Sequence, residues 1–401
     1  MSKIDKIFNS FVSHGLFKDK RVLQSNYLPE NIAHRDEQVE AVASILAPSL
    51  RGEKISNLFI YGKTGTGKTL SVQHVGGKIL EKLKEIEQES VQFVYINCKL
   101  KKVADTEYRI LAEIIRELGG TIPATGLPTD EVYTRFVDLV DKKKQIIILV
   151  LDEIDQAVKK IGDGFIYTLT RLNSELKNAQ INIIGISNSL TLMDNLDPRV
   201  RSSLGEEELV FSPYNALQLQ DILRERAESA FKDGVLEEGA ISKCAAYAAR
   251  EHGDARRALD LLRVAGELAE REQSERVVLK HIDMAKEKIE RDKMLDIIEG
   301  EPRQFQIVLF SIMRLNEKNK GAEISTGEVY NTYKEICEKT KNEILTQRRV
   351  SDIVSEFDML GIINAPVISK GRQGRTREIK LALPSTIGEK AKEILDKALC
   401  L

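Results

Sequence analysis

A loop from Gly62 to Thr69 carries the most specific chemical signal in the sequence. It reads GKTGTGKT and fits the spacing G-x-x-x-x-G-K-[ST]. Glycines let such a loop turn its N–H groups toward phosphate oxygens, and the helix that follows adds the positive end of its dipole. We expect Lys68 to reach the β and γ phosphates of ATP or ADP and Thr69 to ligate Mg²⁺. The predicted phosphate loop consists of Gly62, Lys63, Thr64, Gly65, Thr66, Gly67, Lys68 and Thr69.

An acidic pair, Asp152 and Glu153, follows the apolar run IIILVL. If that run is a strand, both carboxylates come to its carboxyl end beside the phosphate loop. Asp152 is then placed to hold Mg²⁺ through water, and Glu153 to orient or deprotonate the attacking water. The pair predicts nucleotide hydrolysis in addition to nucleotide binding.

Two further polar residues are candidates for contact with the γ-phosphate. Asn188 ends the run INIIGISN and could hydrogen-bond the phosphate or the water, although Asn is also an ordinary turn residue. Arg256 begins a predicted helix in GDARRAL and could bring a cation to the phosphates, with Arg257 as the neighbouring candidate. We therefore expect Lys68, Glu153, Asn188 and Arg256 to form the catalytic set.

These side chains require a sheet edge to bring them together. Five short apolar runs, separated by amphipathic stretches, recur through the first half of the chain, a pattern typical of parallel strands buried on both faces. The carboxyl ends of such strands share one edge. The runs are NLFIY at 57–61, VQFVYIN at 91–97, IIILVL at 146–151, INIIGIS at 181–187 and ELVF at 208–211.

Beyond Pro213 the pattern changes to successive helices, with capping signals at Asn215 and Asp254. The last hundred residues add a capping box at Ser325, a helix that ends at Gly361 and two alternating segments with the signature of a hairpin. Three helices and a hairpin predict a winged helix. We expect an α/β nucleotide-binding subdomain with an N-terminal arm at 1–212, a helical lid at 213–292, a linker near 290–302 and a winged-helix domain at 303–401.

Composition excludes several classes of protein. The 401 residues include 60 Lys and Arg against 62 Asp and Glu, a net charge of −2, so nucleic-acid binding requires local basic patches. The four cysteines have neither zinc-ligand nor disulfide spacing. No apolar run approaches the roughly 18 residues of a membrane span, and the N-terminus lacks the apolar core of a signal peptide. We expect a protein of the cytoplasm, associated with the nucleoid and without a membrane partner.

Taken in order, these motifs resemble those of the AAA+ ATPases, and among them the archaeal replication initiators related to the eukaryotic origin recognition complex and its helicase-loading partner. The resemblance extends from YLPENIAHRDEQVEAV through GKTGTGKT, LVLDEID, GISNSL, LDPRVRSSLGEEELVF and GDARRALDLL to the winged helix. It implies an initiator that binds double-stranded origin DNA and helps to recruit or load the replicative helicase. It also implies tight nucleotide binding with slow turnover, and it makes other initiator paralogues a further candidate partner.

The resemblance also assigns residues to the nucleotide. It makes Asn188 the sensor-1 residue and Arg256 the sensor-2 residue, and it places at the base and its surroundings Tyr27, Leu28, Pro29 and Tyr214. Many related loaders carry Ser-Arg where Ser202 and Ser203 follow Arg201 here. Whether Arg199, Arg201 or neither reaches the nucleotide of a neighbouring subunit therefore stays open.

Basic residues of the predicted winged helix are the candidate DNA contacts. A recognition helix usually meets base edges or phosphates, and the arginines of a wing could enter a minor groove. The candidates are Gln347, Arg348 and Arg349 on the helix, and Lys370, Arg372, Arg375 and Arg377 in the wing. Candidates for a second contact are Lys99, Lys101 and Lys102 or the segment TIPATGLPT, since related initiators insert a DNA-contacting segment between the two nucleotide motifs.

Two other functions fit the same sequence. A hexameric AAA+ branch-migration helicase would form a stable ring with fast turnover stimulated by DNA. A nucleotide-gated adaptor whose winged helix docks protein would show no salt-sensitive DNA binding. An initiator is expected to protect discrete sites on DNA.

Overall fold

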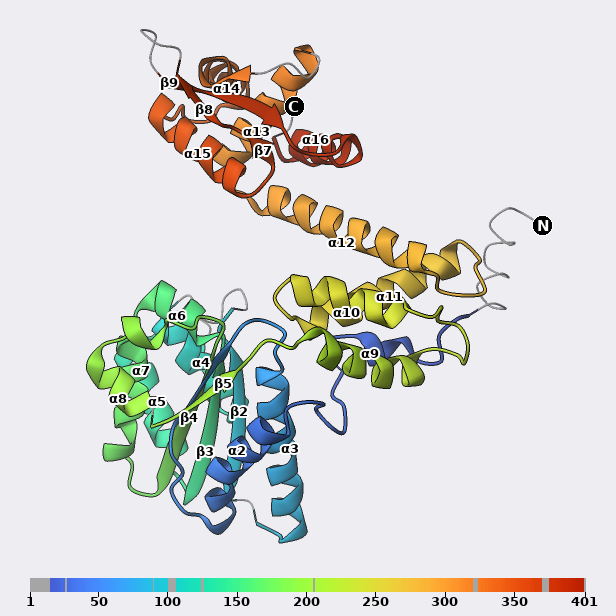
Figure 1. Cartoon of the computed structure of the whole chain (residues 1–401). Helices are drawn as coiled ribbons and strands as arrows, with labels where there is room; N and C mark the ends of the chain where they lie inside the picture. The colour runs from blue at the N-terminus through green and yellow to red at the C-terminus, as the bar shows by residue number, and fades with distance from the viewer. Residues whose placement is uncertain are drawn as a thin grey trace, which may run out of the picture. The chain divides into compact units, whose positions relative to one another are not determined.

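A computed structural model describes residues 15–25, 27–88, 90–99, 106–123, 126–204, 206–319, 324–369 and 375–399, without the side chains of Ser369, Arg375, Thr376, Ser385 and Thr386. The chain divides into two compact units, Met1–Ala285 and Lys286–Leu401 (Figure 1). Within the described residues, none of the helices has the length and apolar character needed to cross a membrane.

The first unit is built on a five-stranded parallel sheet in the order β2-β3-β4-β1-β5. The apolar runs recognised in the sequence become its strands, and every residue of the central strand β3 is buried. The register sets Asp152 beside Asn97 and Ile186, so polar side chains from neighbouring strands share one edge. The strands are β1 (Leu58–Gly62), β2 (Val91–Asn97), β3 (Gln145–Asp152), β4 (Ala179–Ser187) and β5 (Glu207–Phe211).

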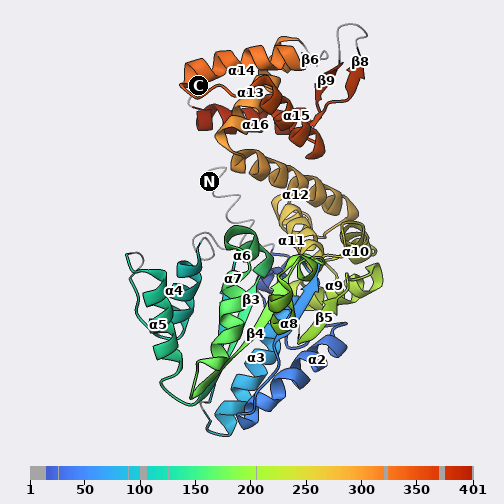
Figure 2. The same ribbon diagram turned by 90° about the vertical axis from the view of Figure 1, so that its left-hand side faces the viewer.

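Helices cover both faces of this sheet (Figures 1 and 2). Because side chains alternate along a strand, Ile148 and Val150 pack with α2 and α3, while Leu149 and Leu151 pack on the other face. The first face is covered by α2 (Asp36–Leu46) and α3 (Lys68–Glu85). The 3-10 helix η2 (Ala47–Arg51) directly follows α2. The second is covered by α4 (Glu107–Glu117), α5 (Thr129–Val140), α6 (Ile154–Ile161), α7 (Gly164–Arg171) and α8 (Pro198–Leu204), with 3-10 turns η3 (Leu172–Ser174) and η4 (Met193–Asn195).

The lid follows β5 as a bundle of helices in the same unit. Its first helix begins with the predicted capping box, in which Asn215 and Gln218 exchange side-chain to backbone hydrogen bonds of 2.9 and 3.0 Å. Asp254 caps the third helix, as predicted, by accepting from the backbone N–H groups of Arg256 and Arg257. The helices are α9 (Ala216–Ala230), α10 (Ala240–Arg250) and α11 (Ala255–Arg271), joined by the N-terminal 3-10 helix η1 (Lys20–Leu23).

The second unit is the winged helix. Its core gathers Phe310, Tyr333, Phe357 and Leu395 from four helices, and strand β9 pairs antiparallel with three short strands (Figure 2). The helices are α13 (Arg303–Lys318), α14 (Thr326–Thr340), α15 (Gln347–Met359) and α16 (Ser385–Leu399), and the strands are β6 (Ile324–Ser325), β7 (Ile363–Asn364), β8 (Val367–Ser369) and β9 (Arg375–Leu381). The sequence reasoning had not included α16 or β6.

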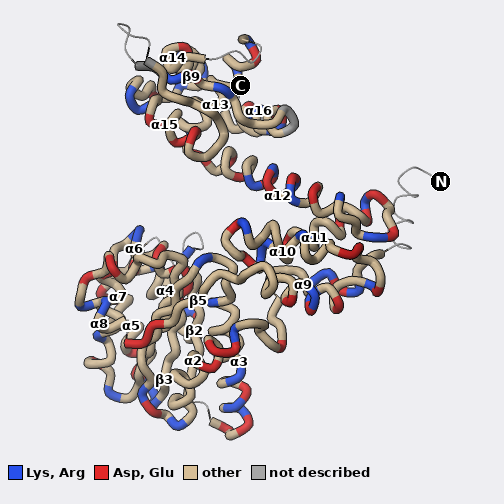
Figure 3. The backbone as a smooth tube through the Cα atoms, in the orientation of Figure 1, with Lys and Arg blue, Asp and Glu red and all other residues tan. Residues whose placement is uncertain are grey.

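The predicted linker differs from what the structure shows. One continuous helix, α12 (Leu279–Gly300), runs through residues 290–300 and ends before Pro302, which cannot continue a helix. Lys, Arg, Asp and Glu alternate along α12 (Figure 3), a pattern that favours a solvated helix. The division of the chain falls inside this helix at Ala285, before the predicted boundaries at 292 and 303.

Candidate functional site

The phosphate loop joins β1 to α3 and lies against the lid. Gly65 and Gly67 have φ angles of 73° and 91°, in the left-handed region that glycine favours. A Cβ atom on Gly65 would collide with the Asp254 carboxylate, and the Gly65 carbonyl accepts from Ala255 N at 3.2 Å. The loop therefore contacts the beginning of α11 directly, which explains why glycine is needed at this position.

Lys68 is held inside the loop. Its side chain is 5% exposed, and Nζ donates to the carbonyls of Gly62 and Lys63 and to Asn188 Oδ1 at 2.7, 2.8 and 2.9 Å. Burial lowers the pKa of Lys68 to about 8, while the negative charge of Asp152 acts in the opposite direction. The ammonium group thus lies at the centre of the loop, where phosphate oxygens could replace these acceptors.

Asp152 and Thr69 converge as the sequence predicts. Asp152 Oδ2 accepts hydrogen bonds from Thr69 Oγ1 at 2.8 Å and from Tyr95 Oη at 2.6 Å, and its Oδ1 accepts from Glu153 N at 2.9 Å. A hydroxyl and a carboxylate are the oxygen ligands that Mg²⁺ prefers. The donor set therefore fits Mg²⁺, which Thr69 and Asp152 could hold together.

Glu153 lies at the same edge in an unusual backbone conformation. Its φ of 52° is in the left-handed region, a conformation that costs about 1–3 kcal/mol in a residue other than glycine. Its carboxylate lies 3.6 Å from Lys99 Nζ, and it lines a polar cavity together with Asn97. This carboxylate is placed beside the loop where a water molecule could approach a bound phosphate.

Asn188 is positioned by a carboxylate from α6. Asp155, which is 3% exposed, accepts from Asn188 N at 3.3 Å and from Ser187 Oγ at 3.2 Å. The ends of β3 and β4 are thereby tied together, and the Asn188 side chain is directed to Lys68. The structure brings four predicted residues into one cavity, namely Lys68, Glu153, Asn188 and Arg256.

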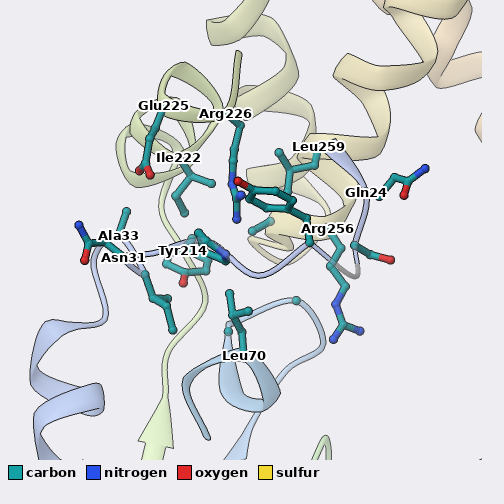
Figure 4. A pocket seen from close by; sticks show the side chains of 17 residues that line it. Gln24, Asn31, Ala33, Leu70, Tyr214, Ile222, Glu225, Arg226, Arg256 and Leu259 are labelled. Carbon is teal, nitrogen blue, oxygen red and sulfur yellow. The ribbon is translucent and has the colours of Figure 1, made fainter. Parts of the chain in front are cut away.

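A second, more apolar cavity lies between the N-terminal arm, the phosphate loop and the lid (Figure 4). Tyr27, Pro29 and Tyr214 line it, as predicted. Leu28 does not, and it is 59% exposed, because successive residues of an extended arm point in opposite directions. The structure therefore separates Leu28 from the other residues expected at the base, whose contact with a nucleotide stays a prediction.

Two arginines of the lid reach this cavity. In Figure 4 Arg226 descends from α9, and its guanidinium lies 4.6 Å from the centre of the Tyr27 ring. Arg256 lines both cavities, which joins the phosphate loop to the base side. Arg257, the alternative to Arg256, instead lies 3.1 Å from Glu251 Oε2.

The two candidates for a trans-acting arginine are both paired within the chain. Arg199 binds the Asp197 carboxylate with two hydrogen bonds of 3.0 Å. Arg201 lies 3.6 Å from Asp194 Oδ1 and is more loosely held. Of the two, Arg201 is the more readily released for contact with another molecule.

The predicted DNA-binding residues of the second unit differ in their surroundings. Gln347, Arg348 and Arg349 are exposed at the beginning of α15, where Figure 3 shows basic residues, and Arg349 forms a 3.9 Å ion pair with Glu356. Arg377 instead donates to Ala365 O at 3.0 Å and to Ser355 Oγ at 2.8 Å. Lys101, Lys102, Lys370 and Arg372 lie outside the described residues, as does the side chain of Arg375.

Comparison with known proteins identifies the family. Residues 53–193 match an AAA domain, residues 220–287 the Cdc6 AAA+ ATPase-type lid domain and residues 296–391 the C-terminal winged helix domain of CDC6. The ORC1-type DNA replication protein of Pyrococcus abyssi is 53% identical over 386 residues, which cover 94% of this chain and 90% of that protein. The chain belongs to the ORC1-type DNA replication proteins.

Other relatives agree with this membership. The ORC1-type DNA replication protein 1 of Methanosarcina mazei is 50% identical over 383 residues, covering 95% of this chain and 91% of that one. The solved structure of the Aeropyrum pernix ORC1 protein in complex with DNA is similar with a TM-score of 0.83, at 45% identity and with coverage of 95% and 97%. The resemblance to archaeal initiators and the expected AAA+ sheet, lid and winged helix are confirmed.

Sequence reasoning missed several side chains in and around this ORC1-type site. Tyr95 and Asp155 lie inside VQFVYIN and LVLDEID, segments that were read only as a strand and an acidic motif. Arg35 and Arg226 were not singled out in the sequence, yet they are 4% and 9% exposed. A hydroxyl near the carboxyl end of an apolar strand was the available signal for Tyr95; the sequence contains none for the two arginines.

Proposed function

We propose that this ORC1-type protein is an ATP-binding initiator that recognises duplex DNA at replication origins. The supporting observation is its likeness over nearly the whole chain to the Aeropyrum pernix ORC1 protein, solved in complex with DNA, at 45% identity. The exposed arginines that begin α15 provide the charge for phosphate contacts. The overall charge of −2 confines such contacts to local patches of this kind.

The nucleotide is proposed to act chiefly as a conformational switch. Lys68 and the loop N–H groups hold the phosphates, and Thr69 and Asp152 hold Mg²⁺, which when bound neutralises charge on the β and γ phosphates. Glu153 orients or deprotonates the attacking water, and Asn188 contacts that water or the γ-phosphate. Arg256 lines the phosphate and base cavities from the lid. Its contact with the γ-phosphate therefore couples the presence of that phosphate to the position of the lid. Slow turnover then leaves the protein in one state long enough to act as a signal.

The test of origin recognition is a nuclease footprint on chromosomal fragments, run with ATP and with ADP at several salt concentrations. We expect protection of a few discrete sites that outlasts an excess of unrelated duplex, with an extent that depends on the nucleotide. Uniform protection of every fragment would contradict origin recognition. Duplex binding that does not respond to salt would contradict DNA as the partner.

We further propose that the DNA-bound protein recruits the replicative helicase. The support is membership of the ORC1-type replication proteins together with a cavity that the lid and the phosphate loop line jointly. Purified helicase should be retained on origin fragments only when this protein is present, and more of it with one nucleotide than with the other. Equal retention on fragments without a footprint would refute recruitment.

A further inference from the structure

Arg35, at the end of the N-terminal arm, is a buried cation whose position the nucleotide chemistry described above does not require. Arg35 is 4% exposed. Burial lowers the pKa of its guanidinium group, and the neighbouring Tyr214 acts in the opposite direction. Among the described residues it has no ion pair with a carboxylate. Burying an arginine in this way is costly unless its donors are used well.

Its donors reach two segments distant in sequence, in addition to the neighbouring carbonyl of His34, which accepts from Nη1 at 3.4 Å. Nε donates to the carbonyl of Thr66 in the phosphate loop at 2.8 Å, and Nη2 donates to the carbonyl of Ser212 at 2.5 Å. The guanidinium also lies 3.9 Å from the centre of the Tyr214 ring. Ser212 and Tyr214 belong to the connection that leads from β5 into the lid.

The same connection returns to the phosphate loop by a second route. Tyr214 N donates to Gly253 O at 3.3 Å, and a Cβ on Gly253 would collide with the Tyr214 carbonyl, so the two segments are in close contact. Two residues later Ala255 N donates to Gly65 O at 3.2 Å. The phosphate loop, Arg35, the connection and the start of α11 therefore form a closed ring of contacts.

We propose that Arg35 is the positioning residue that transmits nucleotide binding from the phosphate loop to the connection between sheet and lid. The planar guanidinium holds the Thr66 and Ser212 carbonyls at a set separation, so displacement of one must move the other or break a hydrogen bond. Because the guanidinium also stacks on the Tyr214 ring, the same displacement reaches Tyr214, whose backbone contacts Gly253. This inference rests on nucleotide binding at the loop, which the following test measures separately.

The test is hydrogen–deuterium exchange of the full chain with and without saturating ADP, read in peptides covering 62–69 and 211–230. In the wild type we expect ADP to slow exchange in both. In R35K and R35M, we expect slowing to persist in 62–69 and to fall below about half of the wild-type value in 211–230. R35K keeps the charge but cannot fork between two carbonyls, and it serves as the informative variant if R35M does not fold.

The matched control is R263M. Arg263 is a half-buried lid arginine whose hydrogen bonds, at 2.9 and 2.8 Å, go to Asp260 and Glu267 on its own helix. In R263M we expect ADP to slow exchange in 211–230 as much as it does in the wild type. Undiminished slowing in 211–230 for both Arg35 variants, or an equal loss in R263M, would overturn this inference. Absence of slowing at 62–69 in the wild type would instead refute nucleotide binding at the loop.

Discussion

The phosphate site and the beginning of α15 place their charged groups in opposite environments. Lys68 and Asp152 are each 5% exposed, and their charged groups form hydrogen bonds, for example from Lys68 Nζ to Gly62 O and from Thr69 Oγ1 to Asp152 Oδ2. Arg348 and Arg349 are exposed, and Arg349 lies 3.9 Å from Glu356 Oε1. One region is ordered before a ligand arrives, and the other is left adaptable.

This difference indicates how strongly each region should respond to substitution of a charged residue. In a buried site, charges interact strongly and an unpaired group is costly, so one substitution has a large effect. On an exposed surface, salt screens each charge, so contributions are small and spread over several residues. The four predictions below test this contrast, starting with the largest expected effect.

K68A should lower the affinity for ATP and ADP by at least about a hundredfold, because a buried cation loses charge-assisted hydrogen bonds worth about 1.5–3 kcal/mol each. Titration calorimetry measures the change. The control is K78A, on the same helix, where exposed Lys78 pairs with Glu81 at 3.0 Å. Wild-type nucleotide affinity in K68A would show that the buried site is not the phosphate site.

Y95F should raise the Mg²⁺ concentration needed for half-maximal hydrolysis by about tenfold, as expected when a group that orients a metal ligand is lost. Affinity for ADP in the presence of chelator should not change, because the hydroxyl that Y95F removes donates to the Asp152 carboxylate. Y133F is the control, since Tyr133 Oη donates to Glu175 at 3.3 Å. Identical Mg²⁺ dependence in Y95F and the wild type would remove Tyr95 from the site.

The R348A/R349A double variant should weaken duplex binding about three- to tenfold and reduce the slope of log affinity against log salt by about 2. Fluorescence anisotropy over a salt series gives both values. R314A/K390A removes the same charge from exposed positions on α13 and α16 and should leave the slope unchanged. Equal slopes for both double variants and the wild type would exclude α15 from the DNA interface.

R377A should lower the free energy of unfolding of the winged helix by about 1–3 kcal/mol while leaving the salt slope of DNA binding unchanged, because Arg377 is bonded to Ala365 and Ser355. Urea unfolding, followed by anisotropy, tests both parts. A slope reduced by about 1 with unchanged stability would restore the DNA contact predicted from the sequence.

Much of the fold follows from local sequence. Apolar runs such as IIILVL predict strands because only a sheet covered on both faces can bury them. The capping box at Asn215 and Gln218 predicts the start of α9 because its hydrogen bonds lie within four residues. The alternating charges of 279–300 were taken in part for a linker, since a solvated helix leaves a weak apolar signal.

The candidate site divides in the same way. The phosphate loop, Asp152, Glu153 and Asn188 were predictable because each sits within a few residues of a strand end. That Leu28 does not line the cavity and that Tyr95 contacts Asp152 were not predictable, because which side of an extended segment faces a cavity depends on what packs against it. The sequence predicted that Arg377 contacts DNA. In the structure its guanidinium donates hydrogen bonds to Ala365 and Ser355, and these compete with a contact to DNA.

By itself the sequence determined the chemistry available to this protein: the loop that can wrap a phosphate, the acidic pair and the order of strands and helices. These depend on residue type and short spacing, which the chain carries wherever it folds. Only the tertiary structure decided that Arg35, Thr66, Ser212 and Tyr214 meet, and that Arg256 lines both cavities. Such contacts join residues far apart along the chain, so no local pattern specifies them.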